Sequence, residues 1–280
     1  MKRVVITGVS SGIGRAVAEE LAAHGFHVFG SVRREEDAAP LASALGARFT
    51  PLVFDVTDVA AVRAAAVYVK ERVGEAGLQG LVNNAGIAVA GPLLHLSPDE
   101  LRRQMEVNLI GVLNAVQAFF PLLRTPCSDG RPGRIVNLSS VSGRFASPFL
   151  GAYAASKHAL EALSDSLRRE LMIYGVDVIV IEPGRVRTPI WEKVPAARQF
   201  DDTDYGPILR RLLEELPKRT ESALPATAVS RVIRRALTAR RPRARYAIPD
   251  QRLLGWLLPR WLPDRWLDRL IAAGLKRVQS

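Results

Sequence analysis

Short runs of β-branched residues alternate with longer helical patterns over the first 180 residues of this 280-residue chain, and this alternation restricts the possible folds more than any other feature. Strands are predicted at Arg3–Ile6, His27–Gly30, Arg48–Phe54, Gly80–Asn83, Arg134–Leu138 and Val176–Glu182. The helices predicted between them include Ile13–His24, Val59–Val73, Ser97–Leu123 and Ala152–Tyr174. Strands that alternate with helices of roughly 10 to 20 residues form βαβ units. We therefore expect an α/β fold with a doubly wound parallel sheet and helices on both faces.

A glycine-rich stretch, Thr7–Gly14 (TGVSSGIG), follows the first predicted strand directly and opens the first helix. Glycines at such a position allow positive φ and a close approach of backbone N–H groups to a pyrophosphate, which the N-terminus of the helix stabilises. The candidate nucleotide contacts in this stretch are Gly8, Ser10, Ser11, Gly12, Ile13 and Gly14. The alternative is that these glycines serve only a tight turn between strand and helix.

The end of the second predicted strand bears on the choice of cofactor. An Asp or Glu at this place accepts hydrogen bonds from the ribose 2′-OH of NAD. This chain has Arg33 and Arg34 instead, and a guanidinium group is a bidentate partner for a 2′-phosphate. The sequence therefore favours NADP(H) over NAD. In the alternative interpretation, the two arginines pair with Glu35, Glu36 and Asp37, which follow them.

Two further strand ends carry candidate cofactor contacts. Asp55, followed by Val56, could accept the adenine amino group, or it could cap the helix that begins near Val59. The run Asn83–Gly86 (NNAG) ends the fourth strand, where small residues would let a cofactor lie close to the backbone. The expected contacts from this run are Asn83, Ala85 and Gly86.

Four polar residues are candidates for the chemistry. Tyr153 and Lys157 stand four apart on a predicted helix and so face the same way. A fixed ammonium group near a tyrosine favours the phenolate and would lower the tyrosine pKa. Ser140 lies just beyond a strand and could bind a carbonyl oxygen, and Asn108 lies within an apolar helical stripe. Each also has a structural interpretation: a tyrosine in a helix interface, a lysine extended along an apolar surface, a serine in a turn and an asparagine that kinks a helix.

In their order and spacing, these residues resemble the short-chain dehydrogenase/reductase family. The resemblance covers roughly residues 3–190 and rests on Thr7–Gly14, Asn83–Gly86, Asn108, Ser140, Tyr153-x-x-x-Lys157, and Pro183-Gly184 followed by Thr188. Ser140, not Ser139, stands at the family's usual distance before the tyrosine. The resemblance implies a single Rossmann-type domain of about seven strands, with Ala244–Ile248 as the seventh. It also implies a homodimer or homotetramer, formed through the helices that carry Asn108 and Tyr153.

The resemblance assigns a role to each candidate. Tyr153 would be the general acid and base, Lys157 would bind the nicotinamide ribose and lower the tyrosine pKa, and Ser140 would orient the substrate oxygen. Asn108 would hold a water molecule in a proton relay. The residues expected to flank the nicotinamide and bind its carboxamide are Pro183, Gly184, Val186 and Thr188. We therefore expect an NADP(H)-dependent oxidoreductase that transfers a hydride between the cofactor and a carbonyl or alcohol.

The regular alternation stops after Pro183. Within a Rossmann-type domain of residues 1–249, residues 188–225 are a candidate substrate lid or, alternatively, a solvent-facing insertion. The apolar side chains that could line the substrate site are Ile190, Trp191, Phe200, Tyr205 and Ile208. The Arg33 position and the C-terminal stretch most resemble hydroxysteroid and retinol dehydrogenases, so we expect a bulky hydrophobic substrate that is steroid-, retinoid- or lipid-like.

The C-terminal extension, residues 250–280, combines tryptophans, leucines and basic residues. Residues 231–280 hold 13 Lys and Arg against 3 Asp and Glu, which accounts for nearly all of the net charge of +11. Pro259 and Pro263 divide the extension into two predicted segments, and Asp264 is the predicted N-cap of the second. In that second segment one face gathers Trp266, Leu267, Leu270, Ile271 and Leu275. Such a face suits a membrane interface, and it also suits packing over the substrate pocket or against a second subunit.

Several other classes of protein do not fit the sequence. The single cysteine, Cys127, excludes an intramolecular disulfide, and none of the four histidines stands at metal-ligand spacing, so we expect no metal site. The first strand leaves no room for a signal peptide, and no apolar run approaches the roughly 18 residues of a membrane span. We expect a cytoplasmic or membrane-peripheral protein. The basic tail lacks the polar–aromatic pattern of nucleic-acid binding, so no nucleic acid is expected. An NADP(H)-binding redox-sensing regulatory protein is the alternative function.

Overall fold

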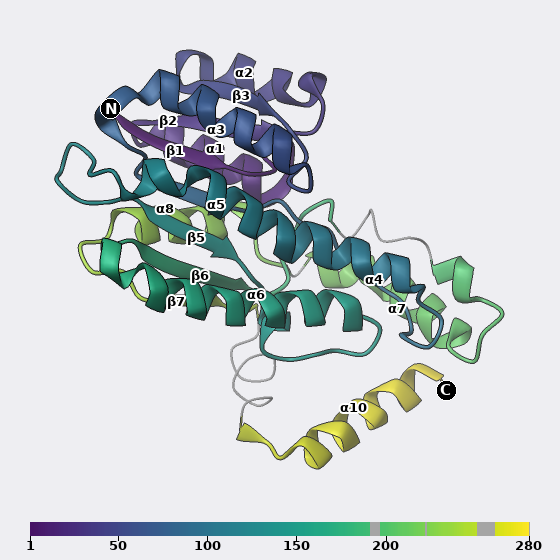
Figure 1. Ribbon diagram of the computed structural model, residues 1–280. Coiled ribbons are helices and arrows are strands. Elements are labelled where there is room, and N and C mark those ends of the chain that lie inside the picture. Colours follow the sequence, from purple (N-terminus) through teal and green to yellow (C-terminus); the bar gives the residue numbers. More distant parts are fainter. Residues whose placement is uncertain (191–196, 222, 251–260, 280) are drawn as a thin grey trace.

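The structure, a computed structural model, describes residues 1–190, 197–221, 223–250 and 261–279, and its layers are shown in Figure 1. Within these residues, seven parallel strands form one sheet in the order β3-β2-β1-β4-β5-β6-β7. The strands are β1 (Lys2–Ile6), β2 (Phe26–Val32), β3 (Phe49–Val53), β4 (Gly80–Asn83), β5 (Arg134–Leu138), β6 (Asp177–Pro183) and β7 (Arg245–Ile248). The expected seven-stranded Rossmann-type sheet is confirmed.

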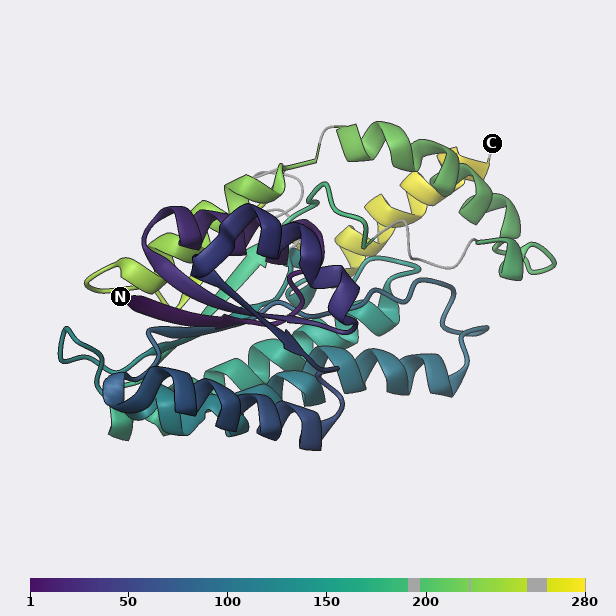
Figure 2. The same ribbon diagram turned by 90° about the horizontal axis from the view of Figure 1, so that it is seen from above.

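Helices cover both faces of the sheet, because successive side chains of a buried strand point to opposite sides. In β1, Val4 and Ile6 pack into one hydrophobic core, while Val5 packs into the other. The first core is closed by α1 (Gly12–Ala23), α2 (Ala39–Leu45) and α8 (Ala226–Thr238). The second is closed by α3 (Val59–Val73), α5 (Gly111–Arg124) and α6 (Gly151–Glu170), and Figure 2 shows both layers beside the sheet.

The long helix predicted at Ser97–Leu123 is built from three parts. It begins with α4 (Pro98–Met105), whose capping box joins the Ser97 hydroxyl and the Glu100 carboxylate to each other's backbone N–H. A π-helical turn (Glu106–Ile110) follows, and α5 continues to Arg124. The 27 residues Pro98–Arg124 are long and apolar enough to cross a membrane by length and composition, and half of their apolar window is buried within the protein. In α5 the apolar side is part of the second core.

After Pro183 the alternation of strands and helices is interrupted and then resumes, and the seventh strand predicted at Ala244–Ile248 is confirmed as β7. Beyond α7 (Gly206–Glu221), α8 packs against α1, and β7 then pairs in parallel with β6. The apolar residues Val229, Ile233 and Ala236 lie on one face of α8, and this face is buried although the helix also carries three arginines. An ion pair of 2.7 Å between Arg234 Nε on α8 and Glu20 Oε1 on α1 joins the two helices.

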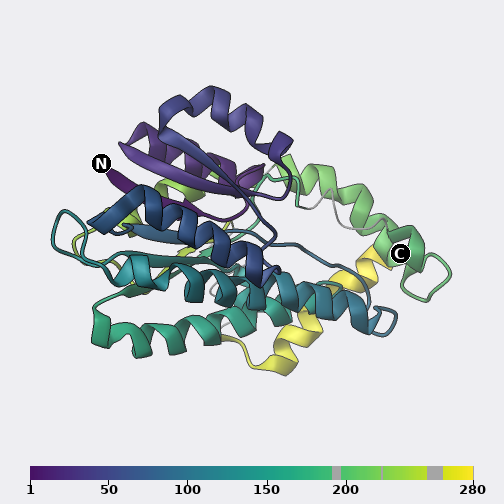
Figure 3. The ribbon, with the colours of Figure 1, turned by 45° about the horizontal axis from the view of Figure 1, so that its top comes forward.

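The last helix, α10 (Asp264–Gln279), packs against α7, and Figure 3 shows the two helices at the same end of the molecule. The helix begins at Asp264, so that residue is its first helical position and not the N-cap that the sequence predicted. The first predicted segment of the extension, with Trp256 and Pro259, lies outside the described residues.

Candidate active site

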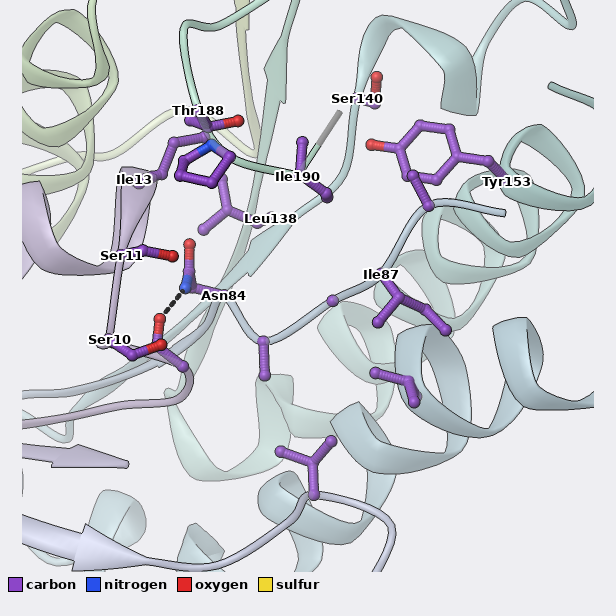
Figure 4. A pocket seen from close by; sticks show the side chains of 18 of the residues that line it. Ser10, Ser11, Ile13, Asn84, Ile87, Leu138, Ser140, Tyr153, Thr188 and Ile190 are labelled. Carbon is purple, nitrogen blue, oxygen red and sulfur yellow. Dashed lines mark hydrogen bonds between the residues drawn. The ribbon is translucent and has the colours of Figure 1, made fainter. Parts of the chain in front are cut away.

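A cavity of about 680 Å³ opens at the carboxyl ends of the strands, where the strand order reverses between β1 and β4. Doubly wound sheets bind their ligands at this switch point. The predicted site residues that line the cavity are Gly8, Ser10, Ser11, Gly12, Ile13, Arg33, Asp55, Val56, Ala85, Gly86, Ser140, Tyr153, Lys157, Pro183, Gly184, Val186 and Thr188. Figure 4 shows that residues far apart in the sequence, such as Ser10 and Ile190, lie around this cavity.

The glycine-rich loop after β1 is pressed against the loop after β4. Gly8 has a φ of +72°, and a Cβ built on it would lie 2.9 Å from Cα of Ala85. A Cβ on Gly14 would collide with the carbonyl oxygen of Gly8 and the side chain of Asn84, so a residue with a side chain does not fit there. Gly14 therefore serves the packing of the loop and lies outside the cavity lining, contrary to its predicted role as a contact.

The two asparagines after β4 have different positions. Asn83, a predicted contact, is buried in the sheet, where its amide donates a 2.8 Å hydrogen bond to Asn137 Oδ1, and it lies outside the cavity lining. Asn84 lines the cavity in its place and donates hydrogen bonds to the carbonyl oxygens of Thr7 (2.9 Å) and Gly8 (2.7 Å). Figure 4 shows Asn84 facing the Ser10–Ser11 turn. The side chain of Asn84 thus holds the glycine-rich loop in place.

The two arginines after β2 also have different positions. Arg33 lines the cavity, whereas Arg34 lies outside the lining and pairs with Asp37 (2.9 Å) and Glu36 (3.3 Å). The pairing alternative is therefore correct for Arg34, and Arg33 is left as the cation that can meet a 2′-phosphate. Asp55 lines the cavity and accepts two hydrogen bonds from Thr57.

The capping alternative for Asp55 is wrong. The N-cap of α3 is Asp58, whose carboxylate accepts a 3.0 Å hydrogen bond from the backbone N–H of Ala61. Asp55 is thus left at the end of β3, beside Val56, with its carboxylate in the cavity wall.

Lys157 is buried at the reactive end of the cavity. Its Nζ donates a 2.7 Å hydrogen bond to the carbonyl oxygen of Leu138 and lies 5.7 Å from the ring centroid of Tyr153. Burial lowers the pKa of Lys157 to about 8, although the negative charge of Glu161 acts in the opposite direction. The ammonium form is still the major one at neutral pH.

Tyr153 lies beside Ser140, and Figure 4 shows the two hydroxyl groups near one another. Burial raises the pKa of Tyr153, and a hydrogen bond with Ser140 acts against this increase. Desolvation of the phenolate is the larger of these two effects, and the expectation that Lys157 lowers the tyrosine pKa stays a prediction. The Ser140 hydroxyl also accepts a 3.1 Å hydrogen bond from the backbone N–H of Ser142. The site therefore presents a protonated phenol next to a fixed hydroxyl group.

Asn108 lies in the π-helical turn, is buried, and lies outside the cavity lining. Its Oδ1 accepts a 2.9 Å hydrogen bond from the N–H of Ile87, and its Nδ2 donates to the Ile87 carbonyl (3.0 Å) and to Ser156 Oγ (3.1 Å). The side chain therefore holds the loop after β4, and the role of Asn108 in holding a relay water stays a prediction.

Gln104 was missed by the sequence analysis and extends this support. Its Oε1 accepts a 2.7 Å hydrogen bond from the N–H of Val89, and its Nε2 donates a 2.9 Å bond to the Ile87 carbonyl. Ser156 in turn donates a 2.7 Å bond to the carbonyl oxygen of Tyr153. The sequence did contain a signal for Gln104: its amide side chain stands four residues before that of Asn108, on an otherwise apolar helix face.

Apolar residues form part of the cavity wall, together with the charged residues Glu100, Arg103 and Glu106. Ile190 was predicted from the sequence to line the substrate site, whereas the lining residues Ile87, Ala88, Val89, Val107 and Pro189 were not. Of the other predicted lining residues, Phe200 and Ile208 are buried, Tyr205 packs edge-on against Phe149 with 5.8 Å between ring centroids, and Trp191 lies outside the described residues.

The chain is similar to known oxidoreductases along its whole length. The family model described as short chain dehydrogenase matches residues 2–199, a range that includes every predicted catalytic and cofactor-binding residue. An NADPH-dependent 3-dehydrocapnine reductase of Ornithobacterium rhinotracheale is 42% identical over 279 residues, with 99% of each chain covered. Retinol dehydrogenase 5 of Mus musculus is 37% identical, with 98% of this chain and 89% of the relative covered. The solved structure of a short-chain dehydrogenase from Streptomyces avermitilis aligns with a TM-score of 0.75 and 29% identity over 99% of this chain and 95% of that one.

Proposed function

The chain belongs to the short-chain dehydrogenase family and is an NADP-dependent oxidoreductase, and on this basis we propose that it interconverts a bulky hydrophobic carbonyl compound and its alcohol. One observation carries the proposal: the hydroxyl groups of Tyr153 and Ser140 lie together at the end of a cavity that has apolar residues in its adjoining wall. In Figure 4, Ile87 and Ile190 lie near Tyr153 on that wall. A reductase for 3-dehydrocapnine and a retinol dehydrogenase among the relatives support a steroid-, retinoid- or lipid-like substrate.

The residues of the cavity fit NADP(H). The space between the glycine-rich loop and Ala85 is one that a Cβ on Gly8 would fill, so backbone N–H groups there can approach a pyrophosphate. We assign the 2′-phosphate to Arg33, the adenine to Asp55 and Val56, the nicotinamide ribose to Lys157, and the nicotinamide carboxamide to the segment from Pro183 to Thr188. When bound, NADPH supplies the hydride.

The chain's own residues supply the proton and stabilise the phenolate that its transfer leaves behind. Because burial raises its pKa, Tyr153 is a phenol at neutral pH and can donate its proton to the substrate oxygen. Ser140 donates a hydrogen bond to the same oxygen and holds it near the phenol. Lys157, charged at neutral pH, stabilises the phenolate that remains after the transfer. The apolar wall excludes water and receives the rest of the substrate.

The proposal is tested by following NADPH absorbance with a panel of carbonyl compounds, from small diketones to retinal, a 17-ketosteroid and 3-dehydrocapnine. We expect kcat/KM to be highest among the bulky apolar compounds. Turnover confined to small polar diketones would contradict the assignment of substrate class. NADPH binding without turnover of any member of the panel would favour the redox-sensing alternative.

We also propose that the C-terminal extension contacts a membrane surface, because one of the two apolar stripes of α10 is exposed. Leu267, Ile271 and Leu275 are half-buried, in the helix that packs against α7, which agrees with the packing alternative. The second stripe is exposed and consists of Trp266 (61% exposed) and Leu270 (55%), with Trp261 (83%) just before the helix. The exposed side chains of Arg265 and Arg269 lie next to this stripe. Tryptophan with neighbouring arginines suits an anionic lipid surface.

A homodimer or homotetramer formed through α5 and α6 remains our proposal for the assembly. Exposed apolar side chains at the ends of these helices support it, namely Ile110, Met172 and Ile173. Light scattering on the purified full-length protein tests it: a mass of two or four chains is expected, and a monomer at micromolar concentration would contradict the proposal.

A further inference from the structure

Two carboxylates and two guanidinium groups form a cluster where α6, the catalytic helix that carries Tyr153 and Lys157, packs against the turn after Ser140 and the strands β6 and β7. None of the steps described above uses this cluster. This ionic cluster consists of Arg144, Glu161, Glu182 and Arg245. Arg144 pairs with Glu182 (Nε to Oε1, 3.0 Å) and with Glu161 (Nη2 to Oε2, 3.1 Å). Arg245 approaches Glu161 Oε2 at 3.0 Å and Glu182 Oε1 at 3.5 Å. The two glutamates are almost fully buried, with 4% of Glu161 and 1% of Glu182 exposed.

The cluster joins segments that carry the site. Arg144 follows the turn that begins at Ser140, and Glu182 directly precedes Pro183 in the cavity wall. Arg245 is the first residue of β7. The ion pairs therefore link the serine turn, the catalytic helix and the strand that leads to the nicotinamide segment.

Glu161 lies one helical turn beyond Lys157 on α6 and on the same face. The turn after Ser140 packs directly against it, because a Cβ on Gly143 would lie only 3.1 Å from Cγ of Glu161. Oε1 of Glu161 is buried and has no hydrogen-bond partner among the residues that the structure describes. The ion pairs of the two arginines run to the other oxygen, Oε2, so one acceptor of this carboxylate is left unsatisfied on the helix face that also carries Lys157.

Stability alone is a weak reason for this arrangement. Apolar side chains of similar volume stabilise a core as well as a buried ion pair does, or better, because both ions must be desolvated. Lys157, by contrast, must stay charged in a buried position, and burial lowers its pKa to about 8 while the charge of Glu161 raises it. A fixed negative charge one turn away is the simplest means to keep that ammonium group protonated.

We propose that Glu161 is a positioning residue of the reaction: its carboxylate, held in place by Arg144 and Arg245, keeps Lys157 charged beside Tyr153. The inference rests on the proposed function, in which the lysine charge stabilises the phenolate. The charged groups that face Glu161 are Lys157 and Asp165 on its own helix, and Arg144, Glu182 and Arg245 from the serine turn, β6 and β7.

The test is a pH titration of Lys157 in the full-length protein without cofactor or substrate, so that it does not depend on the proposed reaction. Lys157 is one of six lysines, and its ¹³Cε NMR signal is assigned by its loss in Lys157→Met. We expect a midpoint near pH 8 for the native protein and a midpoint about one pH unit lower or more in Glu161→Gln. The matched control is Asp165→Asn, which removes another partner of Arg245 (2.8 Å) from the same helix, two turns beyond Lys157, and should leave the midpoint within about 0.3 pH unit.

A second variant keeps the test decisive if Glu161→Gln does not fold. Arg144→Gln removes a cation that shares the Glu161 carboxylate, so the Lys157 midpoint should rise. The pH profile of kcat should follow the titration, with its falling limb at lower pH in Glu161→Gln and at unchanged pH in Asp165→Asn. Midpoints that are the same in the native protein, Glu161→Gln and Arg144→Gln would overturn the proposal, even if the enzyme is active. A shifted midpoint in a protein that turns over no carbonyl compound would leave the electrostatic role intact and refute the reaction instead.

Discussion

The ammonium group of Lys157 is hydrogen-bonded, at 2.7 Å, to the carbonyl oxygen of Leu138, the last residue of β5. This contact joins the catalytic helix to the strand that leads into Ser140. One turn earlier on the same helix, Tyr153 reaches the same region of the cavity. The spacing of Tyr153, Ser140 and Lys157 is therefore set by the docking of α6 on the sheet.

Tyr153→Phe should abolish turnover and leave NADPH affinity within a few-fold of the native value. The substitution removes the proton donor but none of the contacts assigned to the cofactor. Steady-state kcat and the Kd for NADPH from fluorescence titration measure the two effects. Retention of more than about a tenth of the native kcat would show that another group donates the proton.

The charge of Lys157 should limit activity at high pH. Because its pKa is lowered to about 8, the ammonium group loses its proton as the pH rises through that value, and kcat should fall there. In the unfolded chain the lysine has its ordinary pKa of 10.5 and keeps its proton to higher pH. Between about pH 8 and 10.5 the contribution of Lys157 to the free energy of unfolding therefore becomes more favourable to the folded state as the pH rises. A kcat that stays constant up to pH 10 would contradict a role for the lysine charge.

Lys157→Met should inactivate the enzyme without loss of stability at pH 7. The buried ammonium group costs about 3 kcal/mol relative to its unfolded state, which the substitution removes. The carbonyl of Leu138 then loses its partner, at a cost of about 1–3 kcal/mol, so the two effects nearly balance. Calorimetry measures the result. A decrease of the unfolding temperature by more than about 5 °C would mean that the lysine serves the fold.

Arg33→Ala should weaken NADPH binding by about 10- to 100-fold, as expected for a lost charge-assisted contact of about 1.5–3 kcal/mol, and should hardly change NADH binding. Arg34→Ala is the matched control, since Arg34 is paired with Asp37 and Glu36 outside the cavity lining. Equal losses for both cofactors in Arg33→Ala, or an equal loss of NADPH affinity in both variants, would refute the assignment of the 2′-phosphate to Arg33.

Replacement of Trp261, Trp266 and Leu270 together by serine should abolish binding to vesicles of phosphatidylglycerol and phosphatidylcholine. These side chains are exposed and contribute little to the protein's own core, so the unfolding temperature should be unchanged. The control is Leu267→Ser with Ile271→Ser, which should lower the unfolding temperature, because these two residues are half-buried in the helix that packs against α7. Flotation measures binding, and no binding of the native protein at low salt would exclude the membrane contact.

The sequence alone determined the strands and most of the helices, and it indicated the candidate catalytic residues. Alternation of apolar runs predicted the bounds of Gly80–Asn83 and Arg134–Leu138 correctly, because a strand buried on both faces is rich in apolar residues. The glycine-rich stretch and the four-residue spacing of Tyr153 and Lys157 were equally accessible. Such features are local: each depends on backbone geometry over a few neighbouring residues.

Only the tertiary structure decided which of two adjacent residues reaches the cavity. Asn83 and Asn84 are chemically the same, but the last residue of β4 pairs with Asn137 of β5 in the sheet, while the next one leaves it. Arg33 and Arg34 separate in the same way, since successive side chains at the end of a strand point in opposite directions. The ionic cluster lay beyond prediction altogether, because Arg245 becomes a neighbour of Glu161 only when β7 joins the sheet next to β6, and Arg144 only when the turn after β5 packs against α6. Local spacing specifies what a segment can form, and the register of distant strands specifies what it meets.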